Sequence, residues 1–249
     1  MMVKIKSPEE IELMKVSGHV NYLTHQLLKN KLTSGMTTKE LDTLANDFII
    51  SQGCTSSITG YEGFPGNICI SINDEIVHGI PGDRIIKEGD IVSIDIGVIY
   101  RGYHSDMAYT YEVGATNNDK QYLLKHTKQA LEEGLKMVRE GVHIGDISAA
   151  IENYAKKHKL GVVRELVGHG VGKNLHEEPD IPNYGRKNTG LKLQAGMTLA
   201  IEPMLNLGSK KIRLMDDNWT IVTYDGKPSA HFEHTIAVTD DGYEILTGE

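Results

Sequence analysis

Apolar and polar residues alternate from position 91 to position 98, which predicts a β-strand with two distinct faces. One face takes Val92, Ile94, Ile96 and Val98, and the other takes Ile91, Ser93, Asp95 and Gly97. Gly102 then gives the chain a place to turn. With a turn centred on Arg101-Gly102, or a loop over 99–102, Asp95 and Asp106 would project from one face of a hairpin. A three-residue loop would place them on opposite faces.

Two helices are predicted before this hairpin. The stretch Ser7-Pro8-Glu9-Glu10 combines a capping box with a proline in the first turn, which is typical of a helix start. A second helix opens at Thr37, with Glu40 three residues on, and stops at Gly53. Short β segments are expected at 67–72 and 75–78.

The same pattern restarts after the hairpin. Helices are predicted from about 118 to 139 and 146 to 159, and strands at 219–224 and 229–238. The stretch LQAGMTLAIE (193–202) echoes IKEGDIVSID (86–95), so Glu202 falls where Asp95 fell. We therefore expect an α/β protein built from two repeats, about 7–113 and 118–238, in one domain over 1–249. The two halves would share a pseudo-twofold axis, pack their strands together, carry helices on one face and leave a cleft between them.

Composition and charge narrow the function classes. Of 249 residues, 39% are hydrophobic and 24% charged, which is ordinary for a globular protein. The net charge of −8 argues against a broad basic surface for nucleic acid. Cys54 and Cys69 fit a reducing compartment and are expected to be small core residues. With no apolar signal region and no long apolar run, the sequence predicts a cytoplasmic protein without a membrane span.

Acidic residues and one histidine suggest a metal site. The candidate ligands are Asp95, Asp106, Glu202, Glu233 and His169. Adjacent carboxylates on a sheet repel each other, and a divalent cation relieves that repulsion. Four carboxylates balance two divalent ions better than one zinc ion. His169 lies in GHGVG, within a Gly- and Pro-rich stretch, 168–190, that is typical of a functional loop. The ordinary alternatives are exposed acids and a structural histidine.

Six motifs carry a resemblance that covers nearly the whole chain. They are NICISINDEIVHGIP (67–81), DIVSIDIG (90–97), HSDMA (104–108), GHGVGKNLHEEP (168–179), MTLAIEPM (197–204) and FEHTIAV (232–238). With them the chain resembles the type I methionine aminopeptidases of the short bacterial kind. The resemblance implies the pita-bread fold, with a mainly antiparallel central β-sheet. It also implies two divalent metal ions, which could be Co, Mn, Fe or Zn.

The resemblance also implies a role for each candidate residue. Asp95 would bind one metal ion with both oxygens, Asp106 and Glu233 would bridge the two ions, and His169 and Glu202 would complete the second. A shared water or hydroxide would attack the peptide carbonyl, with Glu202 as the proton shuttle. His176 would donate to the carbonyl oxygen as charge develops there, and His78 would contact the scissile amide.

A methionine pocket follows from the same resemblance. Its expected residues are Ile58, Tyr61, Phe64, Cys69, His78, Leu175, His176 and Trp219. Many relatives have Cys at 58, Tyr at 64 and Phe at 175, which leaves the shape of the pocket open. They also have Thr at 97, so Gly97 removes a hydroxyl that could hold the free amine of the substrate.

The expected activity is removal of the N-terminal methionine from nascent proteins and peptides when the next residue is small. The partners would be nascent polypeptides at the ribosome. The protein itself would be a monomer that recognises neither nucleic acid nor membrane. One alternative is a proline-directed peptidase of the same fold, although such enzymes usually carry a large extra N-terminal domain. The other is a non-catalytic peptide-binding relative, which would be expected to lack some of the ligands.

Overall fold

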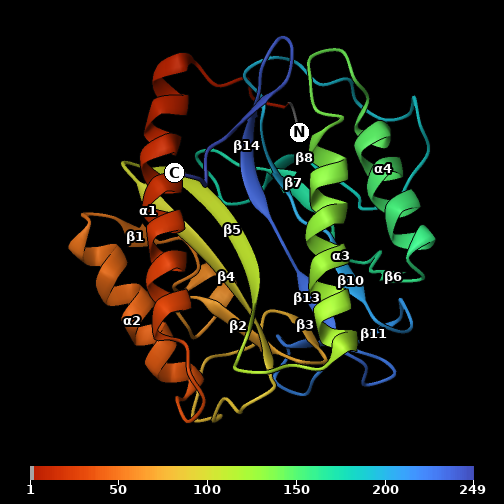
Figure 1. Cartoon of the computed structure of the whole chain (residues 1–249). Coiled ribbons are helices and arrows are strands. Elements are labelled where there is room, and N and C mark those ends of the chain that lie inside the picture. The colour runs from red at the N-terminus through yellow and green to blue at the C-terminus, as the bar shows by residue number, and fades with distance from the viewer. Residues whose placement is uncertain (1–2) are drawn as a thin grey trace.

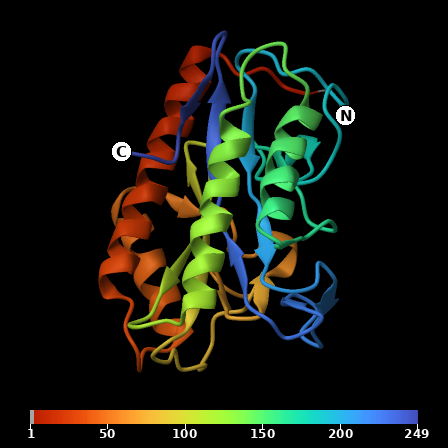
Figure 2. The ribbon, with the colours of Figure 1, turned by 45° about the vertical axis from the view of Figure 1, so that its right-hand side comes forward.

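The computed structural model describes residues 3–249 and places helices over one side of a body of antiparallel strands (Figure 1). The helices are α1 (Pro8–Lys31), α2 (Thr38–Ser51), α3 (Asn118–Leu135) and α4 (Ile144–Lys157), with a 3-10 turn η1 (Tyr61–Gly63). The capping box predicted at Ser7 is formed, and the helix start predicted at Thr37 also has one, made with Glu40. Helices α1 and α2 cover the first half, whereas α3 packs on α4 over the second (Figures 1 and 2).

The first half contains the predicted hairpin. Its strands are β1 (Thr55–Ser56), β2 (Cys69–Ile72), β3 (Glu75–Val77), β4 (Ile91–Tyr100) and β5 (Tyr103–Glu112). Tyr100 lies opposite Tyr103, so Arg101 and Gly102 form the two-residue turn, both with positive φ. Asp95 pairs with Ala108 and Gly97 pairs with Asp106, which puts the two acids diagonally on one face, as predicted.

The second half has shorter strands. They are β6 (Gly161–Val162), β7 (Gly168–Gly170), β8 (Glu177–Ile181), β9 (Thr198–Ile201), β10 (Met204–Asn206), β11 (Ile212–Leu214), β12 (Ile221–Thr223), β13 (Ser229–His231), β14 (His234–Val238) and β15 (Tyr243–Ile245). All the recorded strand pairs in 3–249 are antiparallel, and they form four hydrogen-bonded sheets. Strand β12 pairs with β3 and thereby links the end of the chain to the first half.

Two predictions about the second half were wrong. The stretch 168–190 is not simply a loop, because β7 and β8 pair within it. Gly170 allows this close approach, since a Cβ on it would lie 2.3 Å from the Glu178 carbonyl oxygen of β8. The strand predicted at 229–238 is interrupted between β13 and β14. There the backbone N–H of Glu233 turns to the carbonyl of Ala108 on β5, at 2.9 Å.

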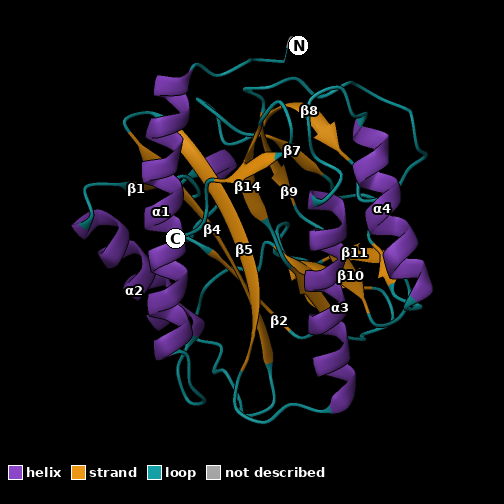
Figure 3. Cartoon of the chain, turned by 45° about the horizontal axis from the view of Figure 1, so that its top comes forward, coloured by secondary structure: helices purple, strands orange, loops and turns teal. Residues whose placement is uncertain are grey.

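The two faces of β4 have different neighbours. Val92, Ile94, Ile96 and Val98 are buried in an apolar core with residues of α1 and α2. A second core joins α3 and α4 to β9 and β14. Asp95 and Gly97 face the opposite way, toward the second half. Figure 3 shows the strands of both halves converging between the helices. None of the helices within 3–249 has both the length and the apolar content that a membrane crossing requires.

Candidate metal centre

The five predicted ligands come from separate strands of both halves and line one small cavity. Asp95 lies on β4, Asp106 on β5, His169 on β7, Glu202 directly after β9 and Glu233 between β13 and β14. All five line a cavity of about 120 Å³. His169 Nε2 lies 3.4 Å from Glu202 Oε1 and 3.8 Å from Asp106 Oδ2. The structure therefore brings together every residue that the sequence suggested as a ligand.

Hydrogen bonds between β5 and the end of the chain hold the two halves in register. Thr235 Oγ1 accepts from the Asp106 backbone N–H at 2.8 Å and donates to the Asp106 carbonyl at 2.7 Å. Four residues further along each segment, Thr110 Oγ1 donates to the His231 carbonyl and accepts from its N–H, each at 2.9 Å. These side-chain to backbone bonds hold the backbone of Asp106 next to the segment that carries Glu233.

His169 is oriented by its own backbone neighbour. Its Nδ1 donates to the Gly170 carbonyl at 2.9 Å, because a carbonyl oxygen can only accept. The Nε2 lone pair is therefore free to face Asp106 and Glu202. Burial, with a smaller contribution from His176, lowers the pKa of His169 to about 3, so the imidazole is neutral near pH 7. A neutral imidazole is the form that binds metal ions.

One titratable residue of this cavity, His231 at the end of β13, is absent from the residues predicted from the sequence. Its Nε2 lies 3.6 Å from Glu202 Oε2 and 3.7 Å from Glu233 Oε2. The spacing of two residues between His231 and Glu233 was a usable signal, because residues i and i+2 of a strand share a face. The adjacent His234 offered the same residue type on the other face, and its Nδ1 bonds instead to Thr247 Oγ1 at 2.9 Å.

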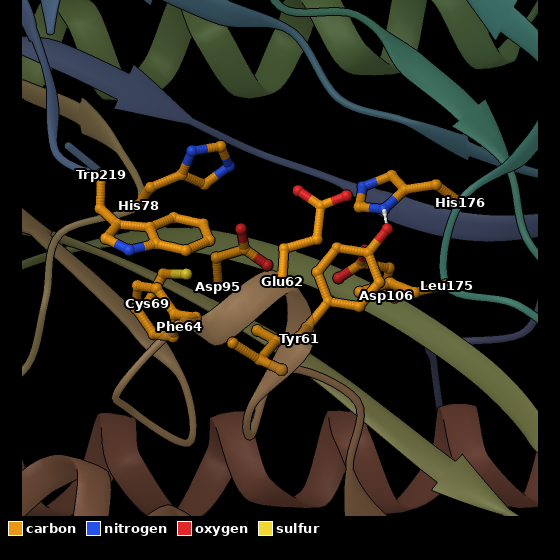
Figure 4. A pocket seen from close by; sticks show the side chains of 11 residues that line it. Tyr61, Glu62, Phe64, Cys69, His78, Asp95, Asp106, Leu175, His176 and Trp219 are labelled. Atoms are coloured by element: carbon orange, nitrogen blue, oxygen red, sulfur yellow. Dashed lines mark hydrogen bonds between the residues drawn. The ribbon is translucent and has the colours of Figure 1, made fainter.

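A larger pocket of about 370 Å³ opens beside the acid cluster. Its lining comprises Ile58, Tyr61, Glu62, Phe64, Cys69, His78, Asp95, Asp106, Leu175, His176 and Trp219. All eight predicted pocket residues are among them, together with Glu62, which the sequence analysis did not select. Figure 4 shows Asp95 and Asp106 between His78 on one side and His176 on the other. The carboxylates therefore lie at the junction of the pocket and the smaller cavity.

The walls of this pocket are aromatic and apolar. Phe64 and Trp219 meet edge to face, with ring centroids 5.1 Å apart. Cys69 is a free, buried thiol on the same wall, and burial raises its pKa well above the usual value. Cys54 is likewise a free, buried thiol, as predicted. On the other side, Tyr61 Oη lies 2.7 Å from His176 Nδ1. Such a lining suits a flexible apolar side chain, with polar groups at one end only.

The sequence profile of metallopeptidase family M24 matches residues 12–240. The chain belongs to this family. It is 51% identical to methionine aminopeptidase 1 of Bacillus subtilis over 99% of both chains. The crystal structure of methionine aminopeptidase from Rickettsia prowazekii superposes with a TM-score of 0.98 at 41% identity, covering 99% of this chain and all of that one. The predicted pita-bread fold is thereby confirmed.

Prolidases share the fold more distantly. The prolidase of Pyrococcus furiosus aligns with a TM-score of 0.80 at 22% identity, with 98% of this chain on 65% of that protein. At this identity the likeness concerns the architecture alone.

The electrostatics of the M24 centre fit bound cations. Burial and mutual repulsion raise the pKa of Asp106 and of Glu233 well above their usual values, and burial alone does so for Glu202. Burial raises the pKa of Asp95 to about 6. Asp106 Oδ1 and Glu233 Oε1 have no hydrogen-bond partner among residues 3–249. Unpartnered buried carboxylate oxygens beside a neutral imidazole form a donor set that suits divalent metals.

Gly97 has a steric explanation in this M24 chain. A Cβ built on Gly97 would lie 2.6 Å from Ser57 Cβ and 3.4 Å from Leu175 Cδ1. The larger side chain expected in relatives would therefore collide with Ser57. The structure thus gives Gly97 a steric role on the Leu175 side of β4.

Proposed function

We propose that this M24 protein is a metal-dependent aminopeptidase that removes the N-terminal methionine from nascent proteins and peptides when the next residue is small. The observation that carries the proposal is the junction of the two cavities. An apolar pocket sized for one side chain shares Asp95 and Asp106 with the acid cluster. A methionine side chain in the pocket would bring its own peptide carbonyl beside the carboxylates. The similarity to bacterial methionine aminopeptidases supports the same substrate.

Two divalent ions would be held by the five predicted ligands. Asp95 would bind one ion, and His169 and Glu202 would bind the other. Asp106 and Glu233 would bind both ions. When bound, the ions polarise the substrate carbonyl and lower the pKa of a water molecule. Co, Mn, Fe and Zn all suit these oxygen and nitrogen donors, so supply in the cell would select among them.

The protein's own groups would handle the protons. Glu202, whose carboxylate reaches both His169 and the cavity, would carry a proton from the attacking water to the leaving amine. Burial lowers the pKa of His176, so its ring is neutral. When Tyr61 donates to Nδ1, the remaining proton of His176 resides on Nε2 and can be donated to the carbonyl oxygen. His78, whose pKa burial lowers to about 4, would contact the scissile amide from the opposite wall.

Further parts of the proposal concern the setting of the reaction. We propose that the protein acts as a monomer in the cytoplasm on chains emerging from the ribosome, without recognising nucleic acid. We also propose that residues 1–249 form one domain, with the repeats 7–113 and 118–238 related by a pseudo-twofold axis. The similar order of α1, α2, β4 and β5 and of α3, α4, β9 and β14 supports this symmetry.

The experiment compares hydrolysis of Met-Ala-Ser with that of an X-Pro peptide, with and without a chelator. We expect release of methionine from Met-Ala-Ser only, loss on chelation and recovery with added metal. Metal analysis of protein purified without added cations would give the native ions. Preferential cleavage of X-Pro would indicate a proline-directed peptidase, and binding without cleavage a non-catalytic relative.

Glu202→Gln provides the matched test of the mechanism. The amide keeps the shape of the side chain but cannot carry a proton as a base, so turnover should fall by a factor of about 10² to 10⁴. Asp106→Asn should act similarly through loss of a bridging charge. Circular dichroism would confirm that the fold is retained. Wild-type turnover in either variant would refute the assigned roles.

A further inference from the structure

We propose that His231 is a second nitrogen ligand of the centre, directed at the ion that Asp95 and Glu233 would hold. The inference rests on the proposed metallopeptidase function and adds a residue to it. It concerns a side chain that the metal-site prediction did not contain.

His231 is a buried imidazole without a hydrogen-bond partner among residues 3–249. His231 is 1% exposed, and neither Nδ1 nor Nε2 has a partner among residues 3–249. Buried histidines elsewhere in the protein are satisfied: His25, for example, bonds through both nitrogens. Buried polar groups in native proteins are nearly always paired, so the unpaired ring of His231 calls for a ligand.

The distance from His231 Nε2 to the carboxylate of Glu233 also fits a shared ion. The Nε2 atom lies 3.6 Å from Glu202 Oε2 and 3.7 Å from Glu233 Oε2, which is longer than an N–H···O hydrogen bond. Two donors that bind one ion at about 2.1 Å, with angles of 90–120° between them, lie about 3.0–3.6 Å apart. The 3.7 Å separation from Glu233 Oε2 is thus close to that of two atoms sharing a cation.

The possible ligands also fall into two groups, each able to hold one ion. Ligand atoms of Asp95, His231 and Glu233 lie within 4.8 Å of one another, and so do those of Asp106, His169 and Glu233. Each group has one aspartate and one histidine, and Glu233 belongs to both. Two adjacent cation positions that share Glu233 therefore each obtain one imidazole.

The backbone holds His231 in this place. Its N–H and carbonyl both bond to Thr110 Oγ1 on β5, and the residue pairs with Met204 of β10. The ring also lines the 120 Å³ cavity together with all five predicted ligands. A second imidazole makes the donor set richer in nitrogen, which suits Fe, Co and Zn better than the harder Mn.

Cobalt titration of the metal-free protein tests this assignment. Solvent-exchangeable imidazole N–H protons of histidines bound to Co²⁺ give strongly shifted proton NMR signals. Fully loaded wild type should show two such signals, one from His169 and one from His231. His231→Gln should lose one signal and bind one of its two Co²⁺ ions about 10- to 100-fold more weakly by calorimetry. His169→Gln should lose the other signal.

His234→Gln is the matched control, because His234 is a half-buried neighbour of Glu233 that bonds to Thr247 and not to the cluster. It should keep both signals and wild-type affinity. Thermal unfolding of the metal-free variants would show that each is folded. His231→Ala provides a second variant, with the same expected loss, if the glutamine variant does not fold.

The outcomes separate this inference from the proposed function. A single shifted signal in fully loaded wild type, or unchanged signals and affinity in folded His231→Gln, would overturn the role of His231. If that wild type also hydrolyses Met-Ala-Ser, the proposed function stands. Two shifted signals in wild type, one of them lost in His231→Gln, would uphold the role of His231 as a ligand. If that wild type did not hydrolyse Met-Ala-Ser, only the proposed aminopeptidase function would be contradicted.

Discussion

Single residues in this protein determine the steric space and the charge at the candidate metal centre. Gly168 and Gly170 illustrate the steric effect, because a Cβ on either would lie within 2.4 Å of a carbonyl oxygen. Their lack of side chains lets β7 lie between β8 and β9 and carries His169 into the cluster. The carboxylates illustrate the effect of charge, since their burial is unfavourable until cations neutralise them.

The contact between Gly97 and Ser57 leads to a prediction at this scale. Gly97→Thr should destabilise the protein by about 1–3 kcal/mol, because the new Cβ would overlap Ser57 Cβ. Denaturant unfolding would measure the change. Gly82→Ala is the matched control, because a Cβ on Gly82 meets no atom within 4 Å. Equal stability of the Thr variant and wild type would show that Ser57 moves aside freely.

At the scale of elements, the packing of α1 on β5 contains a buried titratable group. His25 accepts from the Tyr111 hydroxyl at Nδ1 and donates to the Met107 carbonyl from Nε2, each at 3.0 Å. Burial lowers the pKa of His25 from 6.5 to about 4. The neutral ring is therefore part of the folded state, whereas the unfolded chain takes up a proton as the pH falls below 6.5.

We expect His25 to make the protein acid-sensitive in a defined window. Its contribution to stability is fully present above pH 6.5 and is lost as the pH falls toward 4. Relative to His25→Gln, wild type should lose about 3 kcal/mol of unfolding free energy between pH 7 and pH 4. Urea unfolding at several pH values would measure this difference. His19→Gln, at an exposed position of the same helix, should keep the wild-type slope.

At the scale of the whole molecule, the candidate metal centre lies at the seam between the two halves. Asp95 and Asp106 belong to the first half, and His169, Glu202 and Glu233 to the second. The hydroxyls of Thr110 and Thr235 join the halves through four hydrogen bonds to backbone groups of the opposite half. Neither half alone could hold the proposed pair of ions.

Thr235→Val tests the importance of the seam. Valine keeps the shape but leaves the Asp106 N–H and carbonyl without their partner, which should cost about 2–4 kcal/mol of stability. Because Asp106 would also shift, calorimetry should show weaker metal binding. Thr43→Val, which removes one exposed hydrogen bond on α2, should change neither property much. A stable variant with wild-type metal affinity would show that the seam is held by other contacts.

Local patterns determined much of this protein. Alternation and turn chemistry set the register of β4 and β5 and placed Asp95 and Asp106 on one face. Capping boxes set the starts of α1 and α2. The motifs identified the family and named the four acids and one histidine that the structure brings together. These features depend on interactions between residues that are close in the sequence, so they can be predicted from the sequence alone.

Other features exist only through contacts between distant segments. The break between β13 and β14 arises where Glu233 bonds to Ala108 of the other half. The strands in 168–190 form because β7 inserts between β8 and β9. The place of His231 in the cluster, and the exclusion of a side chain at Gly97, likewise depend on surfaces that meet only after folding. Local sequence preferences set the elements, but long-range packing decided which side chains face one another.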